Sequence, residues 1–131
     1  MMIEEIDLET VWQIRHQVMW PERDASFVRI PEDTDAKHLG VVVDGQCVSI
    51  ISLFTTQDGL QFRKFATLVS EQGKGYGSAL LAHVIQTHPH QTIWCHARVE
   101  KQAYYEKFGF IARDMPFEKN GKIYVRMTLE A

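Results

Sequence analysis

The sequence predicts an α/β fold of the α+β kind, with a single mixed, mostly antiparallel sheet flanked by helices. Two observations predict it. Three segments rich in β-branched and aromatic residues follow one another over residues 38–69, and the Asp-Gly pairs at 44–45 and 58–59 that separate them favour tight hairpins. Amphipathic helical segments then alternate with short β-rich segments. With 131 residues, 45% of them hydrophobic, we expect one domain over residues 1–131.

The N-terminal third predicts a strand, a helix and an irregular segment. Residues 3–6 are long enough for a short strand, and Asp7 is a suitable N-cap for an amphipathic helix over 8–20. Pro21 ends this helix. Residues 21–37 hold two prolines and many charges, which predicts a loop or broken helix able to cover a site.

After the three-stranded antiparallel meander, the pattern predicts two further helices and three further strands. A packed helix covers 75–87, and residues 92–97 form a strand parallel to the last meander strand, because a helix joins the two. A shorter helix over 99–108 is closed by Gly109. Two final strands follow at 110–114 and 122–130, the second with clean alternation of apolar and polar residues.

Composition excludes several classes of function. The formal net charge is -3, so no basic excess favours binding to nucleic acid, and no apolar run is long enough to cross a membrane. The acidic start is unlike a signal peptide, and Cys47 and Cys95 stand among apolar residues, as buried thiols in a reducing compartment do. We therefore expect a cytoplasmic protein. No histidine pair has the i, i+4 spacing of a helical zinc site, and we expect no metal.

The glycine-rich turn at 72–78, Gln-Gly-Lys-Gly-Tyr-Gly-Ser, carries the strongest functional signal. It follows a strand and opens a helix, so its backbone N–H groups and the helix dipole suit a phosphate. The spacing of a P-loop is absent, and Ser78 stands where a dinucleotide fingerprint needs its third glycine. A tight connection with glycines used only for packing remains an alternative from the residues alone.

Two motifs together resemble the GCN5-related N-acetyltransferase (GNAT) family. Gln72, Gly75 and Gly77 match its Gln/Arg-x-x-Gly-x-Gly/Ala signature, and Tyr105 precedes Gly109-Phe110 as a tyrosine does at the end of the next helix in that family. The resemblance extends over residues 41–129. Two positions depart from the family pattern, since Val69 replaces a common proline and Arg98 replaces a common asparagine.

The resemblance implies acetyl-CoA, or another acyl-CoA, as co-substrate. Its pyrophosphate would lie on backbone N–H groups of the turn, and its pantetheine arm would follow the fourth strand where that strand separates from the fifth. The cofactor-binding residues implied are Phe65, Ala66, Thr67, Leu68, Gln72, Gly73, Lys74, Gly75, Tyr76, Gly77 and Ser78. A backbone N–H near Thr67 or Leu68 would polarise the thioester carbonyl.

The resemblance also makes Tyr105 the candidate catalytic residue, because a phenol is protonated at neutral pH and can donate to the departing thiolate. Tyr104 then takes a core position. The strand over 60–68 has no carboxylate to act as base, which leaves His96 and a water chain open. Whether Arg63 and Lys64 face an acidic substrate also stays open.

The predicted function is acyl transfer to a primary amine, on a small molecule or a peptide, by direct attack in a ternary complex. The alternative is a non-catalytic acyl-CoA-binding regulatory module on the same fold. The identity of the amine is open, and so is the choice between a monomer and a homodimer.

Overall fold

Seven strands form one sheet in the computed structural model, which describes residues 1–131. The strands are β1 (Met2–Glu5), β2 (Lys37–Val43), β3 (Gln46–Thr56), β4 (Gly59–Thr67), β5 (Ile93–Arg98), β6 (Ile111–Lys119) and β7 (Lys122–Leu129). Their order is β1-β2-β3-β4-β5-β7-β6, and only β4 and β5 pair in parallel. The predicted mixed, mostly antiparallel sheet is confirmed.

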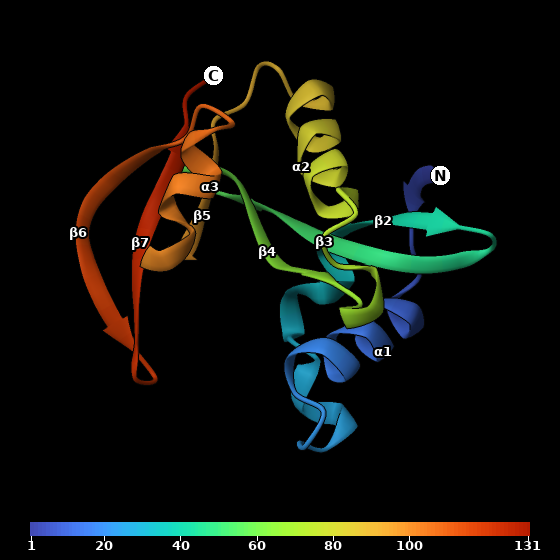
Figure 1. The fold of residues 1–131 in the computed structure, drawn as a ribbon. Coiled ribbons are helices and arrows are strands. Elements are labelled where there is room, and N and C mark those ends of the chain that lie inside the picture. The colour runs from blue at the N-terminus through green and yellow to red at the C-terminus, as the bar shows by residue number, and fades with distance from the viewer.

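Helices cover both faces of the sheet (Figure 1). The α-helices are α1 (Leu8–Met19), α2 (Tyr76–Thr87) and α3 (Gln102–Glu106), and four 3-10 helices are η1 (Ala25–Val28), η2 (Pro31–Asp35), η3 (Val69–Glu71) and η4 (Val99–Lys101). Helix α1 packs on β3 and β4 from one face, together with η1. Helix α2 packs on β2, β3 and β4, and α3 on β6 and β7, from the other face. No helix is long and apolar enough to cross a membrane.

Most predicted elements are confirmed, with differences at the C-terminal end. The Asp7 carboxylate caps α1 by accepting from the Thr10 N–H at 2.8 Å. The segment predicted as one helix over 99–108 begins instead as η4, and its α-helical part is a single short turn. Strand β6 runs to Lys119, beyond the predicted 110–114, and β7 lies between β5 and β6 because the two last strands form a hairpin that pairs through β7.

Strands β4 and β5 are paired only at their beginnings. Leu60 lies opposite Ile93, and Gln61 lies opposite Trp94, with no further pair between the strands. Beyond this point the backbone of β4 that faces β5 has no neighbouring strand. The sheet therefore opens in its middle, and Figure 1 shows its two halves running in clearly different directions on either side of this opening.

A β-bulge lies in β4 beside the opening. Ile50 pairs with Ala66 and Ser52 pairs with Arg63, so that Lys64 and Phe65 together lie opposite one residue of β3. Lys64 has a φ of 56°, in the left-handed region that lysine rarely adopts. Such a bulge shifts the alternation of side chains by one residue, so that residues before and after it change faces.

The irregular segment after α1 is fixed by a buried polar network. Arg15 of α1 and Asp33 of η2 are 0% and 1% exposed and form a two-pronged ion pair with distances of 2.8 and 2.9 Å. The Trp12 indole and the Ile30 N–H also donate to Asp33. Burial raises the pKa of Asp33, but the hydrogen bonds outweigh it and hold the pKa below its ordinary value. The network therefore anchors η2 over the α1 face of the sheet.

Candidate functional site

The turn before α2 presents a row of free backbone donors. The first helical hydrogen bond runs from the Ala79 N–H to the Gly75 carbonyl at 3.0 Å, and the six N–H groups of residues 73–78 have no acceptor within the chain. Gly75 is the N-cap with a φ of 86°, a conformation that favours glycine. Consecutive free N–H groups at the positive end of a helix dipole form a site for a phosphate. The turn therefore fits the pyrophosphate of a coenzyme A.

Side chains of the turn hold it against the end of β4. The Gln72 amide donates to the Thr67 carbonyl at 3.1 Å, and the Lys74 ammonium pairs with the Glu71 carboxylate at 2.6 Å. The hydrogen bond to Glu71, followed by its charge, raises the pKa of Lys74. Gln72, the first residue of the signature, thus has a structural role that the sequence motif does not state.

Phe65 and Thr67 face α2, at the opening between β4 and β5. A Cβ built on Gly77 would lie 3.3 Å from the Thr67 hydroxyl and 3.5 Å from the Phe65 ring. The Leu68 N–H donates to the Val48 carbonyl at 2.9 Å, and because backbone bonds alternate along an antiparallel pair, Thr67 and Phe65 point their backbone groups away from β3 into the opening. Of the two donors considered for the thioester carbonyl, Thr67 is free and Leu68 is occupied.

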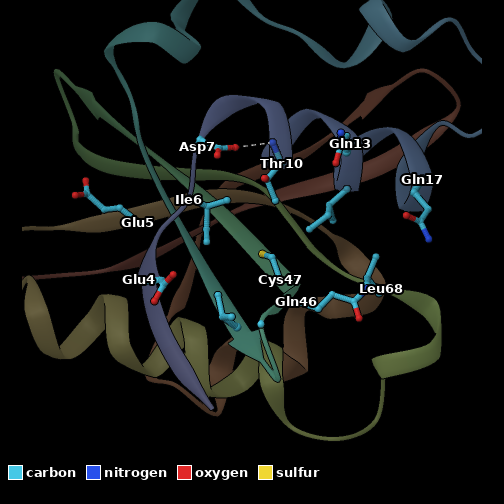
Figure 2. Close-up of a pocket in the computed structure, with 13 residues that line it drawn as sticks. Glu4, Glu5, Ile6, Asp7, Thr10, Gln13, Gln17, Gln46, Cys47 and Leu68 are labelled. Atoms are coloured by element: carbon cyan, nitrogen blue, oxygen red, sulfur yellow. Dashed lines mark hydrogen bonds between the residues drawn. The ribbon is translucent and has the colours of Figure 1, made fainter.

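The other two residues of the implied pantetheine segment lie on the opposite face from Phe65 and Thr67. The side chains of Ala66 and Leu68 are 8% and 6% exposed and pack in the core. Leu68 also lines the pocket beneath α1 that Figure 2 shows. The side chains of Ala66 and Leu68 therefore have a packing role.

Tyr105 lies in α3 with its ring between two phenylalanines. Ring centroids are 5.8 Å from Phe62 of β4 and 5.9 Å from Phe110. Gly109 has a φ of 96°, and the Phe110 N–H bonds back to the Tyr105 carbonyl at 3.3 Å, which closes the helix in a Schellman-type turn. The spacing from Tyr105 to Gly109-Phe110 is therefore what places Phe110 against the tyrosine ring.

The hydroxyl of Tyr105 is available to a ligand. It makes no hydrogen bond within the chain, and it is not among the fully enclosed polar atoms, although the residue as a whole is 9% exposed. Burial raises the pKa of Tyr105 above its ordinary value, and the nearby groups of Cys95 and Tyr104 raise it further. Tyr105 is therefore protonated at neutral pH with a free hydrogen to donate.

Tyr104 connects α3 to the phosphate-binding turn. Its hydroxyl lies 2.9 Å from the Ser78 hydroxyl in the first turn of α2, while its ring packs at 5.2 Å from that of Tyr105. It is half-buried against the core as predicted. The polar link to Ser78 is a second role that the sequence did not indicate.

His96 lies on the other face of β5 from Cys95, beyond the last pair with β4. Its ring packs edge-on between Trp94 at 5.2 Å and Phe117 at 5.0 Å. Burial lowers the pKa of His96, and the positive charges of Arg126, Lys119 and Arg63 lower it further. The imidazole is therefore neutral at pH 7 and able to accept a proton.

Neither the two cysteine thiols nor the pocket of Figure 2 provides an alternative catalytic site. Burial raises the pKa of Cys95 to about 12, and its exposure is 3%, so the predicted inert thiol is confirmed. Cys47 is only half-buried, unlike the prediction, because it lies at the wall of a pocket of about 460 Å³ between β1, α1 and the β2–β3 hairpin. Burial raises its pKa as well.

Comparisons with known proteins show the family of this chain. Residues 9–131 match the family model of an acetyltransferase (GNAT) domain. The uncharacterized N-acetyltransferase YitI of Bacillus subtilis (strain 168) is 30% identical over 131 aligned positions, which cover 91% of this chain and 88% of that protein.

Two solved structures show the same fold. The crystal structure of an acyl-CoA N-acyltransferase from Pseudomonas aeruginosa has a TM-score of 0.83 at 18% identity, with 99% of this chain and 97% of that chain covered. A GNAT family acetyltransferase from Elizabethkingia anophelis, solved with acetyl-CoA bound, has a TM-score of 0.76 at 15% identity, covering 99% and 97%. Because the family model spans nearly the whole chain, this protein belongs to the GNAT family and is an N-acetyltransferase.

Proposed function

We propose that residues 1–131 act as one cytoplasmic N-acyltransferase domain that transfers the acyl group of acetyl-CoA, or of another acyl-CoA, directly to a primary amine. The observation that carries the proposal is the row of six unpaired N–H groups over residues 73–78, in the turn before α2 and in its first turn, beside an opening between two parallel strands. An extended amide-containing arm that leaves the pyrophosphate site can pair with β4 as an added strand would.

Each part of the site has one task in this proposal. The turn over 73–78 binds the pyrophosphate, and the backbone groups of Phe65 are the candidates to bind a pantetheine amide, because the Thr67 carbonyl already accepts from the Gln72 amide. The bound co-substrate supplies an activated thioester. The Thr67 N–H is the candidate donor to its carbonyl oxygen, since a fixed donor needs no reorganisation as charge develops there.

Tyr105 acts on the sulfur in this proposal. Its raised pKa keeps the phenol protonated, so it donates a hydrogen bond to the thiolate as charge develops. A thiol has an ordinary pKa of about 8.5, so complete proton transfer from this phenol would be uphill. Donation, with final protonation from solvent, is therefore the contribution we assign to Tyr105.

The attacking amine must lose a proton, and His96 is the candidate acceptor. It lies beyond the paired part of β5, on the face opposite Tyr105, and its lowered pKa leaves it neutral. A base on the opposite face from the leaving sulfur suits an amine that attacks the thioester from that face. A water molecule can carry the proton between the two.

The test combines binding and turnover in the intact chain. Acetyl-CoA at about 100 times its Kd should stabilise the fold by about 2.7 kcal/mol and raise the Tm. A screen of polyamines, amino acids, aminoglycosides and peptide N-termini, read as release of free CoA, should then identify an acceptor. Stabilisation without release by any amine would favour the non-catalytic acyl-CoA-binding module, and no stabilisation would reject both.

A further inference from the structure

The bulge in β4 places two consecutive cations on one face of the sheet. In a regular strand Arg63 and Lys64 would point to opposite faces. Arg63 lies opposite Ser52, whose hydroxyl accepts from Arg15 of α1 at 2.9 Å, so Arg63 is on the α1 face. Phe65 faces α2, so the bulge leaves Lys64 on one face with either Arg63 or Phe65, and the charges of Arg15 and Asp33 beneath α1, which act on Lys64, favour the face of Arg63.

Neither cation has a carboxylate partner. No ion pair includes Arg63 or Lys64, and no hydrogen bond uses either side chain. Both are half-buried, so solvent screens their charges less than those of exposed side chains. The one carboxylate that acts on Lys64 belongs to Asp33, whose two oxygens are already bonded to Arg15.

Further positive charge surrounds this pair. Lys119, next to the tip of the β6–β7 hairpin, acts on both Lys64 and His96, and Arg126 of β7 lies opposite His96 with its guanidinium 4.1 Å from the Trp94 ring. This positive region stands out on a chain whose net charge is -3. A local field of this sign concentrates anions at the site and repels cations.

The acidic groups nearby do not neutralise the region. Arg63 borders a cleft of about 480 Å³ with Glu32 and Asp35 of η2, both exposed and neither within ion-pair distance of it. Asp58 pairs with Arg126 at 3.4 Å and is itself exposed. Exposed charges of this kind, and that of Lys119 likewise, are strongly screened by solvent and salt, so the unpaired and half-buried Arg63 and Lys64 contribute most to the local field.

The strained backbone at Lys64 points in the same direction. The bulge requires a left-handed φ at Lys64, and lysine adopts the value of 56° at a higher cost than asparagine, aspartate or glycine would. Strain of this kind is found mainly where a side chain is held for function. Here the strained residue is a half-buried lysine of β4 beyond the part of the strand that pairs with β5.

We propose that the amine acceptor carries an anionic group, a carboxylate or a phosphate, and that Lys64 and Arg63 bind this group while the amine points toward His96. The inference rests on the proposed acyl transfer and names its substrate class. Lys64 supplies a point charge at the opening, and Arg63, held 5.2 Å from the Phe54 ring, supplies a planar guanidinium on the cleft side.

Matched acceptors separate this inference from the proposed function. Release of CoA is measured with 4-aminobutanoate beside 1-aminobutane and 1,4-diaminobutane, with L-phenylalanine beside its amide, and with O-phosphoethanolamine beside ethanolamine. We expect kcat/KM at least 10-fold higher for the anionic member of one series, and the series that responds identifies the anion. Equal or better turnover of the neutral and cationic amines would overturn the inference and leave acyl transfer standing. No turnover of any amine by a chain that binds acetyl-CoA would overturn both.

Variants test the assigned residues. Lys64→Gln should lower kcat/KM at least 10-fold for the preferred anionic amine and less than 2-fold for its neutral partner, whereas Lys64→Arg should keep the preference. Lys37→Gln, an exposed strand lysine without an ion pair, is the matched control and should change neither value. Binding of the acetylated product of the preferred amine gives a readout that needs no turnover. This product should raise the Tm of the wild-type chain and of Lys37→Gln, but it should not raise the Tm of Lys64→Gln. An unchanged Lys64→Gln in both assays would reject Lys64 as the anion-binding residue.

Discussion

Loss of the Asp33 charge should be the most costly single change outside the hydrophobic core. In Asp33→Asn the guanidinium of Arg15, 0% exposed, keeps its carbonyl and hydroxyl partners, Val28 and Ser52, but loses its only counter-ion. Breaking a buried ion pair by removing one partner typically costs about 3 to 5 kcal/mol. For a chain of 131 residues this corresponds to a fall in Tm of about 10 to 20 °C.

The assay is thermal and urea unfolding of the wild type, Asp33→Asn and a control, Asp35→Asn, which changes an exposed carboxylate two residues away in η2. The control should stay within about 0.5 kcal/mol of the wild type. Arg15→Met combined with Asp33→Asn removes the orphaned charge, and the double-mutant cycle should give a coupling of about 2 kcal/mol or more. A loss below about 1 kcal/mol for Asp33→Asn, or no coupling, would refute this account of how the irregular segment is held.

The same pair predicts a pH dependence of stability. The pKa of Asp33 is lower in the folded chain than in the unfolded one, so its stabilisation is present above the ordinary value of 3.8 and is lost as the pH falls through the lowered folded value. Asp33→Asn should therefore remove part of the acid sensitivity of the wild type between about pH 5 and the folded pKa.

Three further outcomes are expected. Tyr105→Phe should lower kcat by about 10² to 10³-fold, the usual loss on removing one preorganised hydrogen-bond donor, while leaving the thermal shift with acetyl-CoA unchanged, and a change within about twofold would make Tyr105 a packing residue only. Gly77→Glu should abolish stabilisation by acetyl-CoA with the circular dichroism spectrum retained, whereas Gly77→Ala should bind, since its Cβ requires a shift of only a few tenths of an ångström at Thr67. For the base, the acidic limb of the kcat/KM profile should fall below pH 6.5 with the lowered pKa of His96, and His96→Gln should remove that limb. A limb that persists unchanged in His96→Gln would assign the base elsewhere.

Local patterns in the sequence predict most of the fold because turn residues and capping residues mark the ends of its helices and strands. The Asp-Gly turns, Pro21, the Asp7 cap and Gly109 each act within a few residues, and each lies where the structure ends or begins an element. The insertion of β7 between β5 and β6 was not predicted, because strand order depends on contacts between distant segments rather than on local propensity.

The candidate site also combines features that the sequence predicts with features that it does not. The turn over 72–78 was recognisable because phosphate binding there needs glycines at fixed positions. The position of Arg63 and Lys64 on one face was not recognisable, because regular strand alternation places them on opposite faces. The bulge changes this alternation, but β4 has no glycine after its first residue that would mark a bulge in the sequence. The Arg15–Asp33 pair was missed because its members are 18 residues apart and lie in different elements.

The opening between β4 and β5 gives Tyr105 a structural task beside its proposed chemical one. With only two residue pairs joining the halves of the sheet, the contact across the opening depends on side chains, and the ring of Tyr105 lies 5.8 Å from that of Phe62 on β4. Phe110 contacts both rings, at 6.0 and 5.9 Å, so three aromatic side chains bridge the gap on the α3 face. Removal of the whole ring would therefore loosen the opening and abolish donation to the sulfur at once. Tyr105→Phe removes the hydroxyl alone, which is why it separates the chemical role of this residue from its part in holding the two halves together.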